Sequence, residues 1–106
     1  MKNATTILIA ATLLSSHDAF AWKVLGQGNL SCGSWVKSAG PERYIYETWL
    51  LGFISGTQYG SKTYSFNVDV DAIDVYMTNY CTAHPLENIV QGAKNLAADL
   101  VERSTP

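Results

Sequence analysis

The two cysteines, Cys32 and Cys81, constrain this 106-residue chain more than any other feature. They lie about fifty residues apart, and neither has the CxxC spacing of a redox or metal site. Two cysteines allow a single intramolecular pairing, which is stable only in an oxidising compartment. The alternatives are a free buried cysteine and a bridge between two chains. Which of these three states the cysteines adopt therefore depends on the compartment in which the protein is found.

The start of the chain indicates export. Lys2 supplies a positive charge, an apolar run extends from Ile7 to Leu14, and Ala19-Phe20-Ala21 has the small-x-small pattern of a cleavage site. This is the layout of a secretory signal peptide. The alternative is a buried N-terminal helix, which the polar residues after the apolar run disfavour.

We therefore expect residues 1–21 to be a cleaved signal and residues 22–106 to form one periplasmic domain. No second apolar run is long enough for an integral membrane span. A domain of this size is marginally stable without a staple or a partner. A disulfide between Cys32 and Cys81 would constrain the unfolded chain by about 4 kcal/mol.

Hydrophobic periodicity predicts an all-α fold, a small bundle of about four helices stapled by one disulfide. The expected ranges are 32–37, 41–56, 69–84 and 85–101. The polar segment 57–66 is expected to be a loop. The last helix has the clearest amphipathic stripe, made of Leu86, Ile89, Val90, Ala93, Leu96, Ala97, Leu100 and Val101.

Capping residues support the helix starts. Ser31 and Asp69 are natural N-caps, and Asp71 and Asp74 favour the positive end of the helix that follows. An EF-hand calcium loop does not fit these aspartates, because neither reading frame has the required glycine at its sixth position and acid at its twelfth.

The apolar helix at 41–56 contains a GxxxG pair, Gly52 and Gly56. The pair predicts that another helix can approach closely here. That helix could belong to the same chain or to a second copy, so a homodimer is consistent with the sequence.

Charge and motif content exclude several function classes. The formal net charge is −2 and no basic stripe occurs, so nucleic acid is not an expected partner. His84 is the only histidine after the signal, and it has no nucleophile or second histidine beside it in the sequence. We therefore expect no catalytic residue, no metal and no cofactor. A histidine at a helix end is more often a favourable charge near the helix dipole.

The pattern of Cys32 opening a short helix, an apolar middle helix, and Tyr80-Cys81-x-x-x-Pro85 before an amphipathic helix resembles the HdeA/HdeB periplasmic acid-stress chaperones. The resemblance implies a protein that holds unfolding periplasmic clients in acid. The carboxylates that would sense pH are Asp69, Asp71, Asp74 and Glu87, with Asp99 and Glu102 as further candidates. The client surface would comprise Tyr46, Trp49, Leu50, Phe53 and Ile54. The alternative is that these five residues are core.

A second resemblance concerns the segment from Trp49 to Gly56, WLLGFISG, and His84-Pro85 before an amphipathic helix. Both resemble the Rap/Tai-type immunity proteins of type VI secretion, which block cell-wall-degrading toxins. This implies a dedicated partner protein, with Tyr59, Tyr64 and Phe66 as interface anchors. The alternative is that these aromatic residues fold back onto the core.

Overall fold

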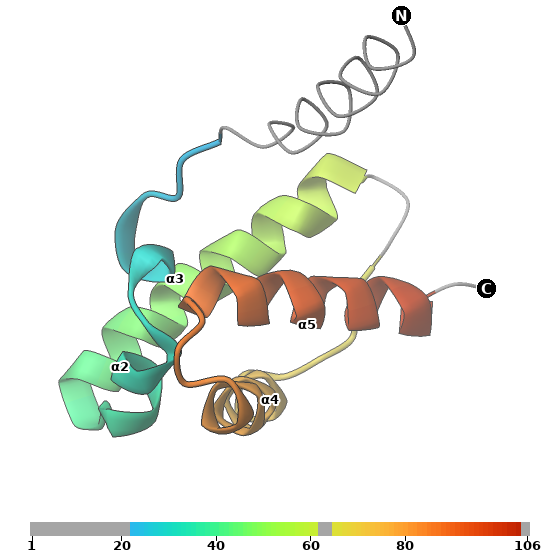
Figure 1. Cartoon of the computed structure of the whole chain (residues 1–106). Coiled ribbons are helices and arrows are strands. Elements are labelled where there is room, and N and C mark those ends of the chain that lie inside the picture. The colour runs from blue at the N-terminus through green and yellow to red at the C-terminus, as the bar shows by residue number, and fades with distance from the viewer. Residues whose placement is uncertain (1–21, 62–64, 105–106) are drawn as a thin grey trace, which may run out of the picture.

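The computed structural model describes residues 22–61 and 65–104, which form an all-α domain (Figure 1). Its elements are the 3₁₀-helix η1 (Gly26–Asn29) and the helices α2 (Cys32–Lys37), α3 (Gly40–Ser61), α4 (Val70–Ala83) and α5 (Ile89–Ser104). The predicted fold class is confirmed. The proposed signal, 1–21, lies outside the described residues. No helix within them is long and apolar enough to cross a membrane.

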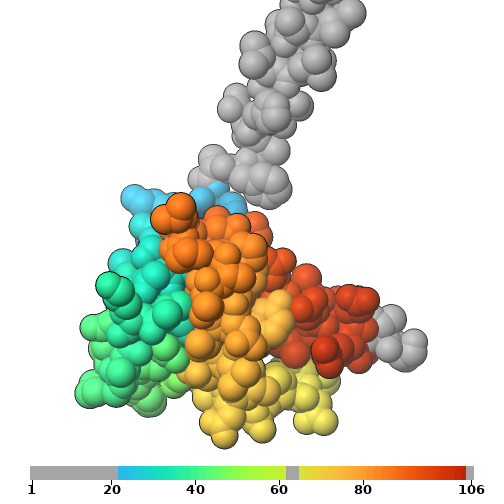
Figure 2. All heavy atoms as spheres, turned by 60° about the horizontal axis from the view of Figure 1, so that its bottom comes forward, coloured from blue at the N-terminus to red at the C-terminus, as the bar shows by residue number. Residues whose placement is uncertain are grey.

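The helices are arranged around α4 and α5. In Figure 1 α4 is viewed nearly end-on, while α5 runs across the picture. Short helix α2 packs against α4, α4 packs against α5, and α3 contacts α5 and η1. Figure 2 brings α4 to the front, with α2 and α3 on one side and α5 on the other.

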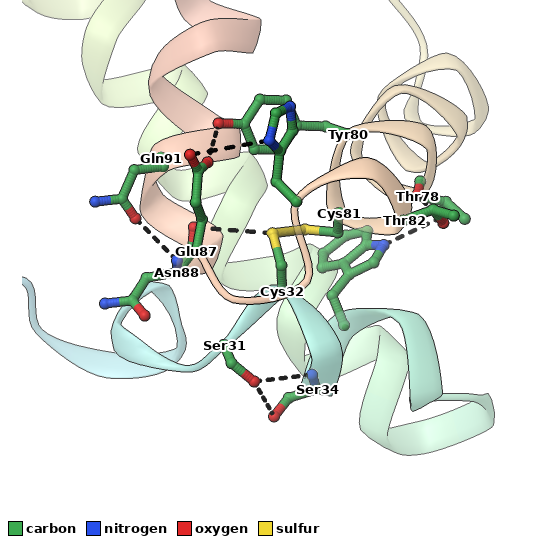
Figure 3. Close-up of a disulfide and its surroundings, with 12 residues drawn as sticks. Ser31, Cys32, Ser34, Thr78, Tyr80, Cys81, Thr82, Glu87, Asn88 and Gln91 are labelled. Carbon is green, nitrogen blue, oxygen red and sulfur yellow. Dashed lines mark hydrogen bonds and ion pairs between the residues drawn. A yellow bond between two sulfur atoms is a disulfide. The ribbon is translucent and has the colours of Figure 1, made fainter.

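The disulfide lies at the corner where α2, α4 and α5 meet (Figure 3). Cys32 and Cys81 are both fully buried, and their Cα atoms are 4.7 Å apart. Backbone hydrogen bonds fix the same corner. The Cys32 amide donates to the Glu87 carbonyl at 2.7 Å, and the Ile89 amide donates to the Leu30 carbonyl at 2.9 Å. The predicted intramolecular pairing is therefore present.

The core is built around this corner. Trp35 of α2 is fully buried, and its Nε1 donates to Thr78 Oγ1 of α4 at 3.1 Å. Gly92 of α5 is buried against Met77 and Tyr80 of α4, where a side-chain Cβ would collide with both. The other buried members of the core cluster are Leu50, Ile54, Ile73, Ile89, Ala93, Leu96, Ala97 and Leu100.

Both predicted N-caps are confirmed. Ser31 Oγ accepts from the Ser34 amide at 3.1 Å, and Asp69 Oδ1 accepts from the Ala72 amide at 2.8 Å. Helix α2 also has the predicted bounds. Side-chain acceptors that satisfy free amides at a helix start are readable from local sequence.

The prediction of a loop at 57–66 is wrong for its first half, because α3 continues to Ser61. The polar residues there are used in helical geometry. Thr57 Oγ1 donates back to the Phe53 carbonyl at 3.0 Å. Gln58 Oε1 accepts from the Phe66 amide at 2.6 Å, which ties the segment after the helix to its last turns.

The predicted start of the last helix at Pro85 is also wrong, since α5 begins at Ile89. A continuous helix would pair the Ile89 amide with the Pro85 carbonyl. Instead the Pro85 carbonyl accepts from Gly33 of α2 at 3.1 Å. Leu86 consequently lies in a turn, 96% exposed, and does not belong to the buried stripe.

Candidate functional site

The most unusual surface of the domain is the outer face of α3. Thr48, Gly52, Gly56 and Gly60 recur every fourth residue along it, and all are exposed. No charged residue occurs from Thr48 to Ser61. We define the outer face as these four residues with the flanking Tyr44, Ile45 and Tyr59, which are exposed as well. An uncharged stripe with small residues and apolar flanks is suited to contact with another protein.

A hollow of about 300 Å³ lies where the outer face meets η1, lined by Gln27, Tyr44, Ile45, Thr48 and Trp49. The indole of Trp49 forms its wall. Its Nε1 donates to the Leu25 carbonyl at 2.8 Å, and its ring covers Gly28, where any Cβ would overlap the ring. The Trp49 and Phe53 rings stack with centroids 5.5 Å apart.

The proposed client-surface residues divide into two groups. Leu50 and Ile54 are buried core residues, so a partner could reach them only after α3 moves. Tyr46, Trp49 and Phe53 are partly buried and pack against the core. The exposed part of α3 is the adjacent face. The sequence analysis selected Tyr59 and the Gly52–Gly56 pair there, but not Tyr44, Ile45 or Thr48.

The proposed immunity-type anchors are not brought together as one loop. Tyr59 is on α3 and 79% exposed. Phe66 is partly buried against the core. Tyr64 lies outside the described residues. Of the three, Tyr59 is therefore the residue that the structure places where a partner could contact it.

The GxxxG pair does not mediate a contact within the described chain. A Cβ at Gly52 or Gly56 would meet nothing within 4 Å. The close helix approach occurs instead at Gly92, between α4 and α5. Gly92 was missed because a lone glycine in an amphipathic stripe gives little signal before the partner helix is known.

Arg43 of α3 is the centre of a polar junction with α2 and α4. Its Nη1 pairs with Asp74 Oδ2 at 3.0 Å, and its Nη2 donates to the Trp35 carbonyl at 2.8 Å. Its Nε donates to Ser38 Oγ at 2.6 Å. The guanidinium also lies 4.8 Å from the centroid of the Trp35 ring, a cation–π arrangement.

Glu47 lies one turn along α3 from Arg43, and its carboxyl is within hydrogen-bonding range of that of Asp74. That hydrogen bond, burial and the Asp74 charge together raise the pKa of Glu47 to about 7. Burial acts to raise the pKa of Asp74, but hydrogen bonds from Glu47 and Arg43 outweigh it and hold the pKa below its usual value. The pair therefore holds one proton over the range between the two values.

The other proposed pH-sensing carboxylates have different surroundings. Glu87 accepts a hydrogen bond from the Tyr80 hydroxyl (Figure 3). Its other carboxylate oxygen lies 4.0 Å from His84 Nδ1. Asp69 caps α4, and Asp71 lies exposed in its first turn. Burial and the Asp99 carboxylate, which accepts from the Tyr76 hydroxyl at 2.7 Å, raise the pKa of Tyr76 to about 12.

Sequence reasoning selected Asp74 but missed Arg43 and Glu47. Their spacing of four on one helix was a local signal for a charged pair. The convergence on Asp74, about thirty residues later, depends on how α3 and α4 pack. No cluster of three or more His, Cys, Asp or Glu side chains suited to a metal ion occurs in the described ranges.

Comparison with protein-family models, with curated proteins and with solved structures gave no match to this chain. The two family resemblances therefore stay hypotheses that depend on the quoted sequence motifs.

Proposed function

We propose that this is a non-enzymatic periplasmic protein that binds other proteins, and that it holds unfolding clients in acid as the HdeA/HdeB chaperones do. The observation that carries the proposal is the uncharged outer face of α3, which exposes apolar and aromatic side chains beside the hollow at Trp49. Exposed apolar surface of this kind marks contact sites on small proteins.

The acid dependence is supported by carboxylates that join different elements. Asp74 of α4 pairs with Arg43 of α3, and Asp99 of α5 accepts from Tyr76 of α4. Charge-assisted hydrogen bonds are about twice as strong as neutral ones. Protonation of these carboxylates in strong acid weakens the links between helices and gives clients access to the inner row of α3, Tyr46, Leu50 and Ile54.

The test is light scattering of an aggregating periplasmic extract brought to about pH 2–3, with and without the mature protein. We expect the protein to suppress aggregation in acid and not at neutral pH. A double variant, Tyr44→Ser with Ile45→Ser, should weaken suppression. Val75→Ser is the matched control, because Val75 is a similarly exposed apolar residue on α4. No suppression at a several-fold molar excess would refute the holdase function.

The alternative is an immunity protein that blocks a cell-wall-degrading toxin. It is favoured by Tyr44 and Tyr59, two exposed aromatic residues near opposite ends of one rigid helix. Rigid tyrosines are typical anchors of tight interfaces. This function predicts one stoichiometric partner at neutral pH, whose hydrolytic activity the protein inhibits. The same Tyr44→Ser change would then weaken inhibition without acid treatment.

A further inference from the structure

Three ionisable side chains meet where α3 contacts α4, one more than a simple ion pair contains. Arg43 and Glu47 approach from α3, and Asp74 approaches from α4. Asp71, one turn earlier on α4, adds a second negative charge near Glu47. The groups that α2 and the turn after it present to Arg43 are uncharged, namely the Trp35 carbonyl and both oxygens of Ser38.

The charge of this cluster changes in two steps. When Glu47 and Asp74 are both ionised, two neighbouring carboxylates share the single cation Arg43. When Glu47 is protonated, its hydroxyl can donate to Asp74, which still pairs with Arg43, and repulsion between the carboxylates disappears. When Asp74 is protonated as well, Arg43 loses its anionic partner.

We propose that Arg43, Glu47 and Asp74 form a proton-operated clasp that holds α3 to α4 most tightly in mildly acidic solution. The clasp weakens at higher pH through repulsion and at lower pH through loss of the ion pair. This proposal goes beyond the proposed function, because the clasp makes the stability of the domain depend on pH whatever the outer face binds.

Linkage gives the sign of each step. Glu47 binds its proton more tightly in the folded state, so folding stability falls as pH rises from the ordinary value of 4.5 to about 7. Asp74 binds its proton less tightly in the folded state, so stability is lost as pH falls below 3.8. The Glu47–Asp74 contribution is therefore greatest between these two transitions.

The experiment is thermal unfolding of the mature protein from pH 3 to pH 9. We expect Glu47→Gln, whose amide keeps a hydrogen-bond donor toward Asp74, to abolish the fall in Tm between about pH 4.5 and 7 that Glu47 causes. Its Tm at pH 8 should exceed the wild-type value by roughly 4–8 °C. Glu42→Gln is the matched control, because it removes an exposed carboxylate from the first turn of the same helix. If the two variants have parallel pH profiles, the clasp is refuted.

A direct measurement keeps the proposal testable if a variant folds poorly. Carbon NMR of the Glu47 carboxyl in the wild-type protein should give a titration midpoint near 7, and Asp74→Asn should move it toward 4.5. A wild-type midpoint already near 4.5 would overturn the proposal, as would a midpoint that Asp74→Asn leaves unchanged.

Discussion

Helices α3 and α5 are the two longest helices of the described chain, yet the domain uses them differently. In α5 the buried residues form one stripe of seven, and the four charged residues are all exposed. In α3, which has 22 residues, only Leu50 and Ile54 are buried, and much of the remaining surface is uncharged. The composition of α5 is explained by the fold of one chain. The composition of α3 is not, which is why the binding proposal is placed there.

The largest expected effect on stability comes from removing the disulfide at the corner where α5 begins. Replacing both Cys32 and Cys81 by serine should cost about 4 kcal/mol of unfolding free energy, because the unfolded chain regains the freedom of a long loop. Urea unfolding followed by circular dichroism at neutral pH measures the loss. Complete absence of a cooperative transition also agrees with the prediction. A loss below about 1 kcal/mol would show that the corner is held by its backbone hydrogen bonds instead.

A pair of alanine substitutions compares the two helices directly. Leu96→Ala on α5 should cost about 2–5 kcal/mol, because Leu96 is 3% exposed and its removal leaves a cavity. Ile45→Ala on the outer face of α3 should change stability by no more than about 0.5 kcal/mol, since Ile45 is 50% exposed. Equal costs at the two sites, measured by urea unfolding, would mean that the outer face is covered in solution.

Alanine substitutions at two glycines, one on each helix, test the same comparison with smaller expected changes in stability. Gly92→Ala should destabilise the domain by about 1–3 kcal/mol, because the new Cβ would collide with Met77 and Tyr80. Gly52→Ala should stabilise it by about 0.5–1 kcal/mol, because alanine favours a helix and nothing lies within 4 Å. Thermal unfolding of both variants checks the opposite signs. Destabilisation by Gly52→Ala would indicate close contact with a second copy or another protein.

The difference between α3 and α5 also explains which features of the fold could be predicted from the sequence. The stripe of α5 was predicted except for Leu86, which is exposed, and Gly92, which was missed. The caps at Ser31 and Asp69 were predicted from local sequence, and the cysteine pairing was predicted from the cysteine count and the expected compartment. The end of α3 was misplaced because polar residues such as Gln58 gave a loop-like composition, while their hydrogen bonds are helical or tertiary. The start of α5 was misplaced because the Pro85 carbonyl bonds to α2.

The candidate site was less predictable. The inner row of α3 was selected because it is apolar, but hydrophobicity alone does not distinguish core from contact surface. Glu47 and Arg43 gained their role from Asp74, which is distant in sequence and adjacent in the fold. A contact between residues that are distant in sequence leaves no pattern in the local sequence from which it could be predicted.

The disulfide has a topological consequence for α3. Because Cys32 and Cys81 are bonded, the whole of α3 lies inside a covalent ring whose closure does not depend on how α3 packs. If α3 leaves the core, the bond still holds Cys32 of α2 against Cys81 of α4. The segment that contains α3 then has fewer conformations to search before it returns than it would in an open chain. A domain connected in this way can open at α3 and re-close with α2 still joined to α4.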